Sequence, residues 1–243
     1  MNLVIDIGNS AIKAAVFDDG KIVASRQWKD NENNPLSEWL NAFPEIHNAI
    51  LSSVRRDDSG IKEALQKAGV NVLVLDDRTQ VPMVNLYRST STLGRDRIAA
   101  AVGAGSRFPG KNLLVIDAGT AITIDFVTAD NEYLGGNISP GLSMRFRSLH
   151  QQTHNLPLVE PEDTPHLFGT DTTGAIRAGV QYGIIFELDE YINRQKIRYP
   201  DLQVVMTGGD AMFFDKKLKN SIFVDPDLNL HGLQRILDYN AGA

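Results

Sequence analysis

The chain contains the same opening twice, and this internal repeat limits the possible folds more than any other feature. Residues 3–17 read LVIDIGNSAIKAAVF and residues 114–128 read LVIDAGTAITIDFVT, so the copies lie 111 residues apart. Each copy is typical of an apolar strand, a tight turn with the pattern Asp-x-Gly-Asn/Thr, and a second β-rich strand. We therefore expect a duplicated architecture. At this offset Asp6 corresponds to Asp117, Gly8 to Gly119 and Asn9 to Thr120.

Both halves continue alike after the repeated hairpin. At about 150 residues per domain, 243 residues fit one large domain or two small ones. A third strand in each half, followed by alternating helices and strands, predicts a mixed sheet flanked by helices, built twice, with halves 1–112 and 113–243. The third strands are expected at 21–28 and 132–136, the later strands at 48–54, 70–75, 202–206 and 222–224, and helices at 36–43, 59–68, 140–152, 173–196, 210–219 and 230–239.

The two Asp-x-Gly turns are suited to phosphate binding. Glycine lets backbone N–H groups approach an anion closely, and the following amide or hydroxyl side chain adds a donor. A carboxylate at the strand end can hold a cation, directly or through water. Lys13, on the second strand of the first hairpin, can reach a phosphate oxygen. One such turn is usually a plain β-hairpin, but its duplication favours a pair that grips a polyphosphate and its metal from two sides.

Three further motifs combine glycine with polar residues. Gly94-Arg95-Asp96-Arg97 opens an apolar helical segment, where Asp96 is either a helix-capping residue or a general base beside an anionic substrate. Residues 135–141 (GGNISPG) predict either a strand–turn–helix connection or close approach by a ligand. Residues 207–210 (TGGD) follow a strand, so they suit either a tight turn or the packing of a flat base or ribose.

Two other patterns carry less weight. Residues 105–112 (GSRFPGKN) nearly match a phosphate-binding loop, but they precede a strand instead of following one, which predicts a helix end and a linker. His150 and His154 have the i,i+4 spacing of metal ligands, but the Glu of a zinc-protease helix is absent. We expect them to be ordinary surface or interface histidines.

The composition excludes several functional classes. The chain has no cysteine, which excludes disulfides, a thiol nucleophile and iron–sulfur clusters. Its 24 basic and 30 acidic residues give a net charge of −6, which argues against general affinity for nucleic acid. No apolar run approaches the roughly 18 residues of a membrane span, and Met1-Asn2 leads directly into a strand without a secretory signal. We expect a cytoplasmic protein that binds neither nucleic acid nor membranes.

Taken together, the motifs resemble those of type III pantothenate kinases, a family within the superfamily of acetate kinases, sugar kinases and actin. The matching runs are 6–13, 94–97, 117–125, 135–141 and 207–210, in the family's order and over nearly the whole chain. The resemblance implies an α/β fold of two ribonuclease H-like domains with duplicated topology, the actin-like ATPase fold, and a nucleotide cleft between the domains. It also implies transfer of a phosphoryl group from ATP to the terminal hydroxyl of pantothenate, the first step of coenzyme A biosynthesis.

The resemblance further implies a role for each matching residue. Asp96 would be the general base for the pantothenate hydroxyl, and Asp117 would bind the monovalent cation, K⁺ or NH₄⁺, that the family requires in addition to Mg²⁺ with ATP. A homodimer is implied, in which the partner subunit closes the substrate pocket. The ATP phosphates would be contacted by Asp6, Ile7, Gly8, Asn9, Ser10, Ala11, Ile12, Lys13 and Thr120, and pantothenate by Tyr87, Gly94, Arg95, Asp96, Arg97 and Thr172.

Two positions depart from the family's pattern. Thr90 stands three residues after Tyr87, where a proline is expected, and this loosens the loop that carries Tyr87. Asp171 stands beside Thr172, where the family more often has asparagine. Both concern the pantothenate pocket and not the base or the phosphate turns. Two alternatives remain: a kinase for another small hydroxy acid, and a nucleotide-binding regulatory protein of the same fold without turnover.

Overall fold

The computed structural model describes residues 1–29, 35–53, 59–163 and 166–241, which form two compact units. Unit 1 comprises Met1–Pro109, Asn131–Tyr133 and Asp227–Ala243, and unit 2 comprises Gly110–Asp130 and Leu134–Pro226. The first crossing between units falls close to the predicted boundary at residue 112, whereas the last helix of the chain packs in unit 1. The assignment of separate functions to 1–112 and 113–243 stays a prediction.

Unit 1 is built on a five-stranded mixed sheet in the order β3-β2-β1-β4-β5. The central strand β1 is antiparallel to β2 and parallel to β4, and β5 extends the sheet in parallel. The sheet is mixed, as predicted, and the repeated opening forms its middle. Residue 54, the last of the predicted strand 48–54, lies outside the described residues. The strands are β1 (Asn2–Ile7), β2 (Ile12–Asp18), β3 (Lys21–Trp28), β4 (Asn48–Ser53) and β5 (Asn71–Val74).

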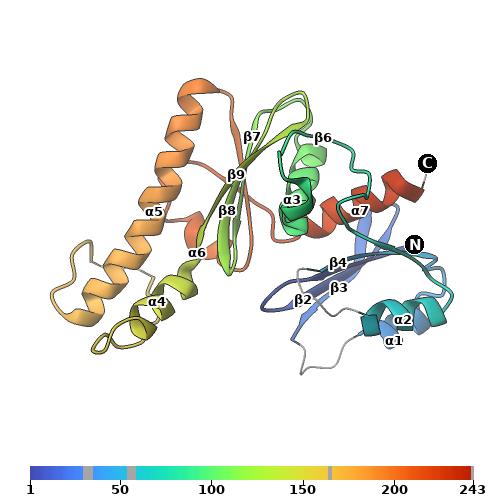
Figure 1. Cartoon of the computed structure of the whole chain (residues 1–243), viewed down its shortest axis with the longest axis horizontal. Helices are drawn as coiled ribbons and strands as arrows, with labels where there is room; N and C mark the ends of the chain where they lie inside the picture. The colour runs from blue at the N-terminus through green and yellow to red at the C-terminus, as the bar shows by residue number, and fades with distance from the viewer. Residues whose placement is uncertain (30–34, 54–58, 164–165, 242–243) are drawn as a thin grey trace. The chain divides into compact units, whose positions relative to one another are not determined.

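Helices cover both faces of this sheet. Leu3 and Ile5 of β1 pack against α1 (Leu36–Ala42) and α2 (Ser59–Lys67). Because side chains alternate along a strand, Val4 and Asp6 point to the other face. That face is covered by α7 (Leu228–Ala241), which contacts β1, β2 and β4, and α7 in turn packs along α3 (Arg95–Arg107) (Figure 1).

The backbones of α3 and α7 nearly touch, and glycine makes this approach possible. A Cβ atom on Gly232 would lie 1.8 Å from the carbonyl oxygen of Ala99, and one on Gly103 would lie 2.4 Å from that of Leu228. Distances below about 3 Å are not tolerated between a Cβ atom and a backbone carbonyl. The crossing therefore fixes α7 against the helix that begins at Arg95.

Unit 2 repeats the central strand arrangement of unit 1. β7 is antiparallel to β8 and parallel to β10, and β10 is parallel to β11. This confirms the duplicated α/β topology. The sheet order is β11-β10-β7-β8-β9-β6, with β6 (Val84–Asn85), β7 (Leu113–Ala118), β8 (Ala121–Val127), β9 (Glu132–Pro140), β10 (Gln203–Thr207) and β11 (Phe223–Val224).

The core of unit 2 lies between this sheet and the helices α4 (Leu142–Gln151), α5 (Thr172–Arg198) and α6 (Ala211–Asp215). The predicted apolar stripe of the long helix is confirmed, because its members are buried against the sheet. Across the described ranges, no helix is both long enough and apolar enough to pass through a lipid bilayer. The stripe consists of Ile176, Val180, Ile184, Leu188 and Ile192.

Several predicted boundaries were wrong, among them those of α6, α7 and β9. The short helix α6 ends at Asp215, before the predicted residue 219, because the Asp189 carboxylate accepts the backbone N–H groups of Lys219 and Asn220, which a continuing helix would use itself. α7 begins at residue 228, not 230. β9 continues to Pro140, so most of the predicted turn at 135–141 is strand.

The two repeated hairpins also differ by one residue in their turns. Ile7 pairs with Ile12 in the first hairpin, but Ala118 pairs with Ile122 in the second. The offset of 111 therefore holds only as far as the turn. Beyond it, the residue paired with Asp6 is Lys13, whereas the residue paired with Asp117 is Thr123.

The close crossing of α3 and α7 predicts that two glycine substitutions in unit 1 have very different effects on the free energy of unfolding. Gly232→Ala should destabilise the protein by about 2 kcal/mol or more, because its methyl group meets the Ala99 backbone. Gly60→Ala, in α2, should stay within about 1 kcal/mol of wild type, on the stabilising side, since a Cβ there meets no atom within 4 Å. Urea denaturation of both variants checks this, and equal effects would contradict it.

Candidate functional site

A row of three polar side chains crosses the sheet of unit 1 at the end of β1. Asp6 is in register with Lys13 on β2 and with Ser52 on β4. All three share the face that α3 and α7 occupy, because their strand neighbours Ile5, Ile12 and Leu51 belong to the opposite core. The turn follows directly, closed by a hydrogen bond from the Gly8 N–H to the Ala11 carbonyl at 3.0 Å.

The Asp6 carboxylate lies in an electrostatically costly position. Burial, and then the neighbouring Asp96 carboxylate, raise the pKa of Asp6 to about 6. A hydrogen bond from Asn229 of α7 and the charge of Lys13 act in the opposite direction. The Ser52 hydroxyl is directed at the same carboxylate, but its Oγ reaches no partner at ordinary hydrogen-bond geometry among the described residues. The structure thus brings together Asp6 and Asp96, which the sequence placed in separate motifs.

Asp96 lies in the first turn of α3, and Gly94 makes room for it. Gly94 is the N-cap residue of this helix, and a Cβ on it would lie 2.5 Å from Asp96 Oδ1. The same oxygen accepts the backbone N–H of Arg97 at 2.8 Å. The carboxylate is therefore held over the start of the helix, where the unpaired N–H groups favour negative charge.

The two arginines that flank Asp96 have different partners. Arg97 is 4% exposed, and its guanidinium lies over the Tyr87 ring at 5.5 Å from the centroid. Tyr87 also lies 6.1 Å from the ring of buried Tyr133. Arg95 instead donates from Nη1 to the Ser53 carbonyl at 2.9 Å, which ties the start of α3 to the end of β4. Arg97 and Tyr133 thus anchor Tyr87 although Thr90, at the start of the short helix η1 (Thr90–Thr92), replaces the expected proline.

The corresponding row in unit 2 is Thr123, Asp117 and Thr207, in register across β8, β7 and β10. Two glycines surround the Asp117 carboxylate: a Cβ on Gly119 would lie 3.2 Å from its Oδ1, and one on Gly208 would lie 2.5 Å from it. Gly208 has a φ of +97°, a conformation that favours glycine. The TGGD motif therefore forms a tight turn that wraps the end of β7.

Thr120 is held by the second glycine motif. The Gly141 N–H donates to the Thr120 carbonyl at 3.1 Å, and a Cβ on Gly141 would lie 2.2 Å from the Gly119 carbonyl oxygen. Arg145 fixes this segment, since its Nε donates to the Pro140 carbonyl at 2.8 Å and its guanidinium pairs with Glu187 of α5. At Gly141 the backbone thus comes close to the second Asp-x-Gly turn, whereas the close approach of a ligand to residues 135–141 stays a prediction.

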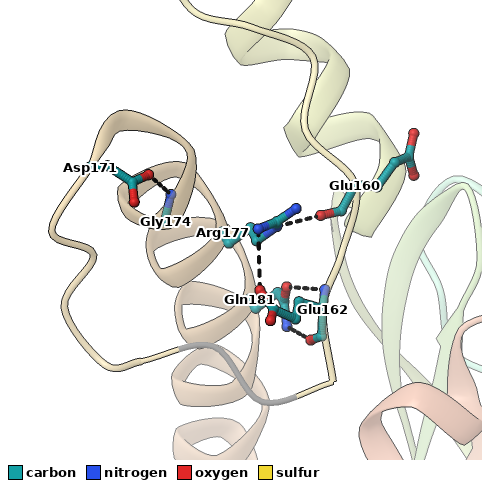
Figure 2. A network of polar contacts seen from close by, with 6 residues as sticks. All are labelled: Glu160, Glu162, Asp171, Gly174, Arg177 and Gln181. Carbon is teal, nitrogen blue, oxygen red and sulfur yellow. Dashed lines mark hydrogen bonds and ion pairs between the residues drawn. The ribbon is translucent and has the colours of Figure 1, made fainter.

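Thr172 is the first residue of α5, and Asp171 caps this helix. Asp171 Oδ1 accepts the Gly174 N–H at 2.8 Å (Figure 2). An aspartate performs this capping as well as an asparagine, so the departure at residue 171 preserves the helix start. Thr172 lines a cavity of about 720 Å³ between α4 and α5, together with Arg145 and apolar side chains of both helices.

The segment before Asp171 is attached to α5 by two long side chains (Figure 2). Fully buried Gln181 accepts the Glu162 N–H at 2.9 Å and donates to the Glu162 carbonyl at 2.6 Å, as a neighbouring strand would. Arg177 donates to the Glu160 carbonyl at 3.0 Å and pairs with the Glu162 carboxylate at 3.2 Å. The segment around residues 160–162 is therefore held against α5 by polar contacts.

Ser52 and Asn229 were missed in the sequence. The signal for Ser52 was available, because alternation along the predicted strand 48–54 places it on the face of Asp6 once the two strands are paired. Asn229 carried no local signal, since its role depends on the packing of the last helix against the first strand.

Comparison with known proteins first defines the class. A solved structure from Campylobacter jejuni, described as a putative Baf family transcriptional activator, has a TM-score of 0.64 with 23% identity and covers 99% of this chain and 100% of its own. A putative 2-dehydro-3-deoxygalactonokinase from Sinorhizobium meliloti has a TM-score of 0.60 with 13% identity and 99% coverage of both chains. With the duplicated mixed sheets, these likenesses place the fold in the actin-like ATPase and sugar-kinase class.

The family follows from sequence similarity over the whole chain. The family model described as type III pantothenate kinase matches residues 2–194. Proteins named type III pantothenate kinase from Bacteroides fragilis and Christiangramia forsetii are 48% and 46% identical over 242 residues, covering at least 99% of this chain and 99% of their own lengths. The chain belongs to the type III pantothenate kinase family, a family of phosphotransferases that act on an alcohol group, and the predicted resemblance is confirmed.

The raised pKa of Asp6 predicts a pH-dependent gain in stability for Asp6→Asn. Between pH 3.8 and about 6 the folded protein keeps a proton on Asp6 that the unfolded chain has released, so wild type loses stability as the pH rises through this window. Asparagine carries no charge, so Asp6→Asn should be more stable than wild type by on the order of 2 kcal/mol at pH 8 and close to wild type at pH 4. Urea unfolding without nucleotide measures both.

Asp76→Asn serves as a control, because the pKa of Asp76 is shifted in the opposite direction to that of Asp6. A hydrogen bond from Thr79 lowers the pKa of this exposed turn carboxylate, so its ionised form stabilises the turn. Asp76→Asn should therefore lose a little stability at pH 8. An Asp6→Asn difference of equal size at pH 4 and pH 8 would show that the charge is not the cause.

Proposed function

We propose that this chain transfers the γ-phosphoryl group of ATP to the terminal hydroxyl of pantothenate, giving 4′-phosphopantothenate in the first step of coenzyme A biosynthesis. The observation that carries the proposal is the meeting of Asp96 with Asp6 beside the first phosphate turn. The identity of the acceptor is supported by the relatives named type III pantothenate kinase.

The first turn supplies the contacts for the ATP phosphates. Backbone N–H groups between Gly8 and Ile12, with the side chains of Asn9 and Ser10, offer donors to phosphate oxygens, and Lys13 adds a positive charge. Asp6 repels phosphate unless a cation lies between them, so Asp6 would face the Mg²⁺ that accompanies ATP. The second turn would add Thr120, whose position is fixed by Gly141.

Asp96 would act as the general base. Phosphoryl transfer depends mainly on positioning and on neutralising charge, with one group that orients the attacking hydroxyl. The hydroxyl oxygen forms a bond to the γ-phosphorus, the bond to the β-phosphate oxygen breaks, and the hydroxyl proton passes to Asp96. The contact of Asp96 Oδ1 with the Arg97 N–H would hold the carboxylate in place at the start of α3 for this transfer.

The remaining predicted residues would form the pantothenate site. Arg97 would orient Tyr87 through the contact between guanidinium and ring, and Gly94 would leave space for the Asp96 carboxylate. Thr172 would donate to the substrate from the start of α5. A homodimer, in which the partner subunit completes this pocket, and a cytoplasmic location also stay predictions.

Asp117 would hold the monovalent cation. Over the parts of the chain that the structure describes, no group of three or more histidine, aspartate or glutamate side chains gathers as a divalent-metal site would. A single carboxylate at Asp117, enclosed by the backbone of Gly119 and Gly208, offers the oxygen donors and the single negative charge that suit K⁺ or NH₄⁺. Such a cation would neutralise charge near the second turn.

The primary test of the function is ADP release by the purified protein with ATP, Mg²⁺ and pantothenate. We expect release that depends on pantothenate and is seen with K⁺ or NH₄⁺ but not with Na⁺ alone. Release with another hydroxy acid, but not with pantothenate, would favour a different small-molecule kinase. ATP binding without turnover on any acceptor would favour a regulatory protein.

Asp96→Asn tests the base. Because amide nitrogen and oxygen cannot accept the hydroxyl proton, the variant should lose about 10²- to 10⁴-fold in kcat while it binds MgATP as wild type does. Steady-state ADP release and calorimetric titration with ATP measure the two quantities. Asp18→Asn, an exposed site on β2, serves as the matched control. Turnover by Asp96→Asn at the wild-type rate would refute the assignment.

A further inference from the structure

The last helix of the chain, α7, contributes a side chain to the site at the end of the first strand, β1. Asn229 lies in the first turn of α7, and its side chain hydrogen-bonds to the Asp6 carboxylate at the end of β1. The family model matches residues 2–194, so α7 lies outside the matched segment. No glycine-rich or charged motif marks Asn229 in the sequence.

The position of Asn229 is fixed by contacts that α7 makes with α3 and with β1. Backbone contacts at Gly232 with Ala99 and at Gly103 with Leu228 hold the start of α7 against α3, which carries Asp96. Further along α7, Asp238 accepts a hydrogen bond from Asn2 of β1 at 3.0 Å. Asn229 is therefore placed with little freedom relative to both carboxylates.

The groups around Asp6 explain why a neutral donor is useful there. Lys13 faces Asp6 from β2, the Ser52 hydroxyl faces it from β4, and Asp96 faces it from α3. A second cation at residue 229 would cancel the charge with which Asp6 faces MgATP. An amide N–H instead donates to the carboxylate without adding a positive charge, so the negative charge of Asp6 is kept.

We propose that Asn229 is a positioning residue for the phosphate site, which orients the Asp6 carboxylate toward the nucleotide and away from Asp96. The proposal rests on the proposed function for the role of Asp6 toward ATP. It makes α7 a part of the nucleotide site, in addition to its role in packing. Asn229 acts through Asp6 and does not itself touch the substrate.

A double-mutant cycle between Asn229 and Asp6 tests this proposal, with MgATP as the probe and no pantothenate present. Asn229→Ala should weaken MgATP binding, measured by calorimetry, by roughly tenfold to a hundredfold, the range for hydrogen bonds to charged groups. In an Asp6→Asn background the same substitution should change the Kd by less than about twofold, because its charged partner is gone. Equal effects in both backgrounds would overturn the proposal.

Asn229→Asp provides a readout that packing alone would not change. It keeps the shape of the side chain but replaces the donor with a third carboxylate, so kcat/KM for ATP should fall at least as far as in Asn229→Ala. Wild-type kcat/KM in Asn229→Asp would overturn the proposal even if the Asp6→Asn background bound ATP too weakly to measure. Asn240→Ala is the matched control. Asn240 lies on the same helix, but its side chain donates hydrogen bonds to the backbone carbonyls of Gln80 and Ile236 and not to Asp6.

The outcomes separate this inference from the proposed function. Pantothenate-dependent turnover by wild type together with unchanged MgATP affinity in Asn229→Ala would refute the role of Asn229 alone. Coupling between Asn229 and Asp6 without turnover on pantothenate would support the role of Asn229 and refute the acceptor. Failure of the wild type to bind MgATP would refute both.

Discussion

Two carboxylates, Asp6 and Asp96, share one buried face of the first sheet, and the organisation of unit 1 follows from the cost of keeping them there. Burial disfavours the charged form of Asp6, and the neighbouring Asp96 carboxylate adds to this effect. The surrounding structure offsets the cost with a lysine on the neighbouring strand, an amide from the last helix and a helix N-terminus beneath Asp96. A protein selected for stability alone would have neutralised one of the pair, so their retention is consistent with a site where charge is needed.

The duplication provides the same backbone twice with different chemistry. In each unit an aspartate at the end of the central strand is flanked in register by residues on both neighbouring strands. In unit 1 these neighbours include Lys13, which suits an anion, whereas in unit 2 both are threonines and glycines surround Asp117. The change of one residue in turn length determines which side chain faces the aspartate. The same hairpin thus places a lysine beside the aspartate in unit 1 and a threonine beside it in unit 2.

Local patterns in the sequence predicted much of the fold. The hairpins, the third strands and the long helix α5 follow from strand alternation and an apolar stripe, which depend on near neighbours in sequence. The end of α6 could not be predicted, because it depends on Asp189 from another helix. The same limit applies to the site: Asp6 and Asp96 were predicted from separate motifs, but their proximity and the part of Asn229 depend on how distant elements pack.

The packing of α7 in unit 1 has a consequence for the order in which the protein becomes functional. The first strand, β1, leaves the ribosome long before the helix that covers it, because α7 comes much later in the sequence. Until residues 228–241 are free to fold, the face that carries Asp6 remains uncovered and its apolar neighbours are exposed to solvent. A chain without these residues would therefore lack one layer of its first sheet, so unit 1 can mature only after α7 has been translated.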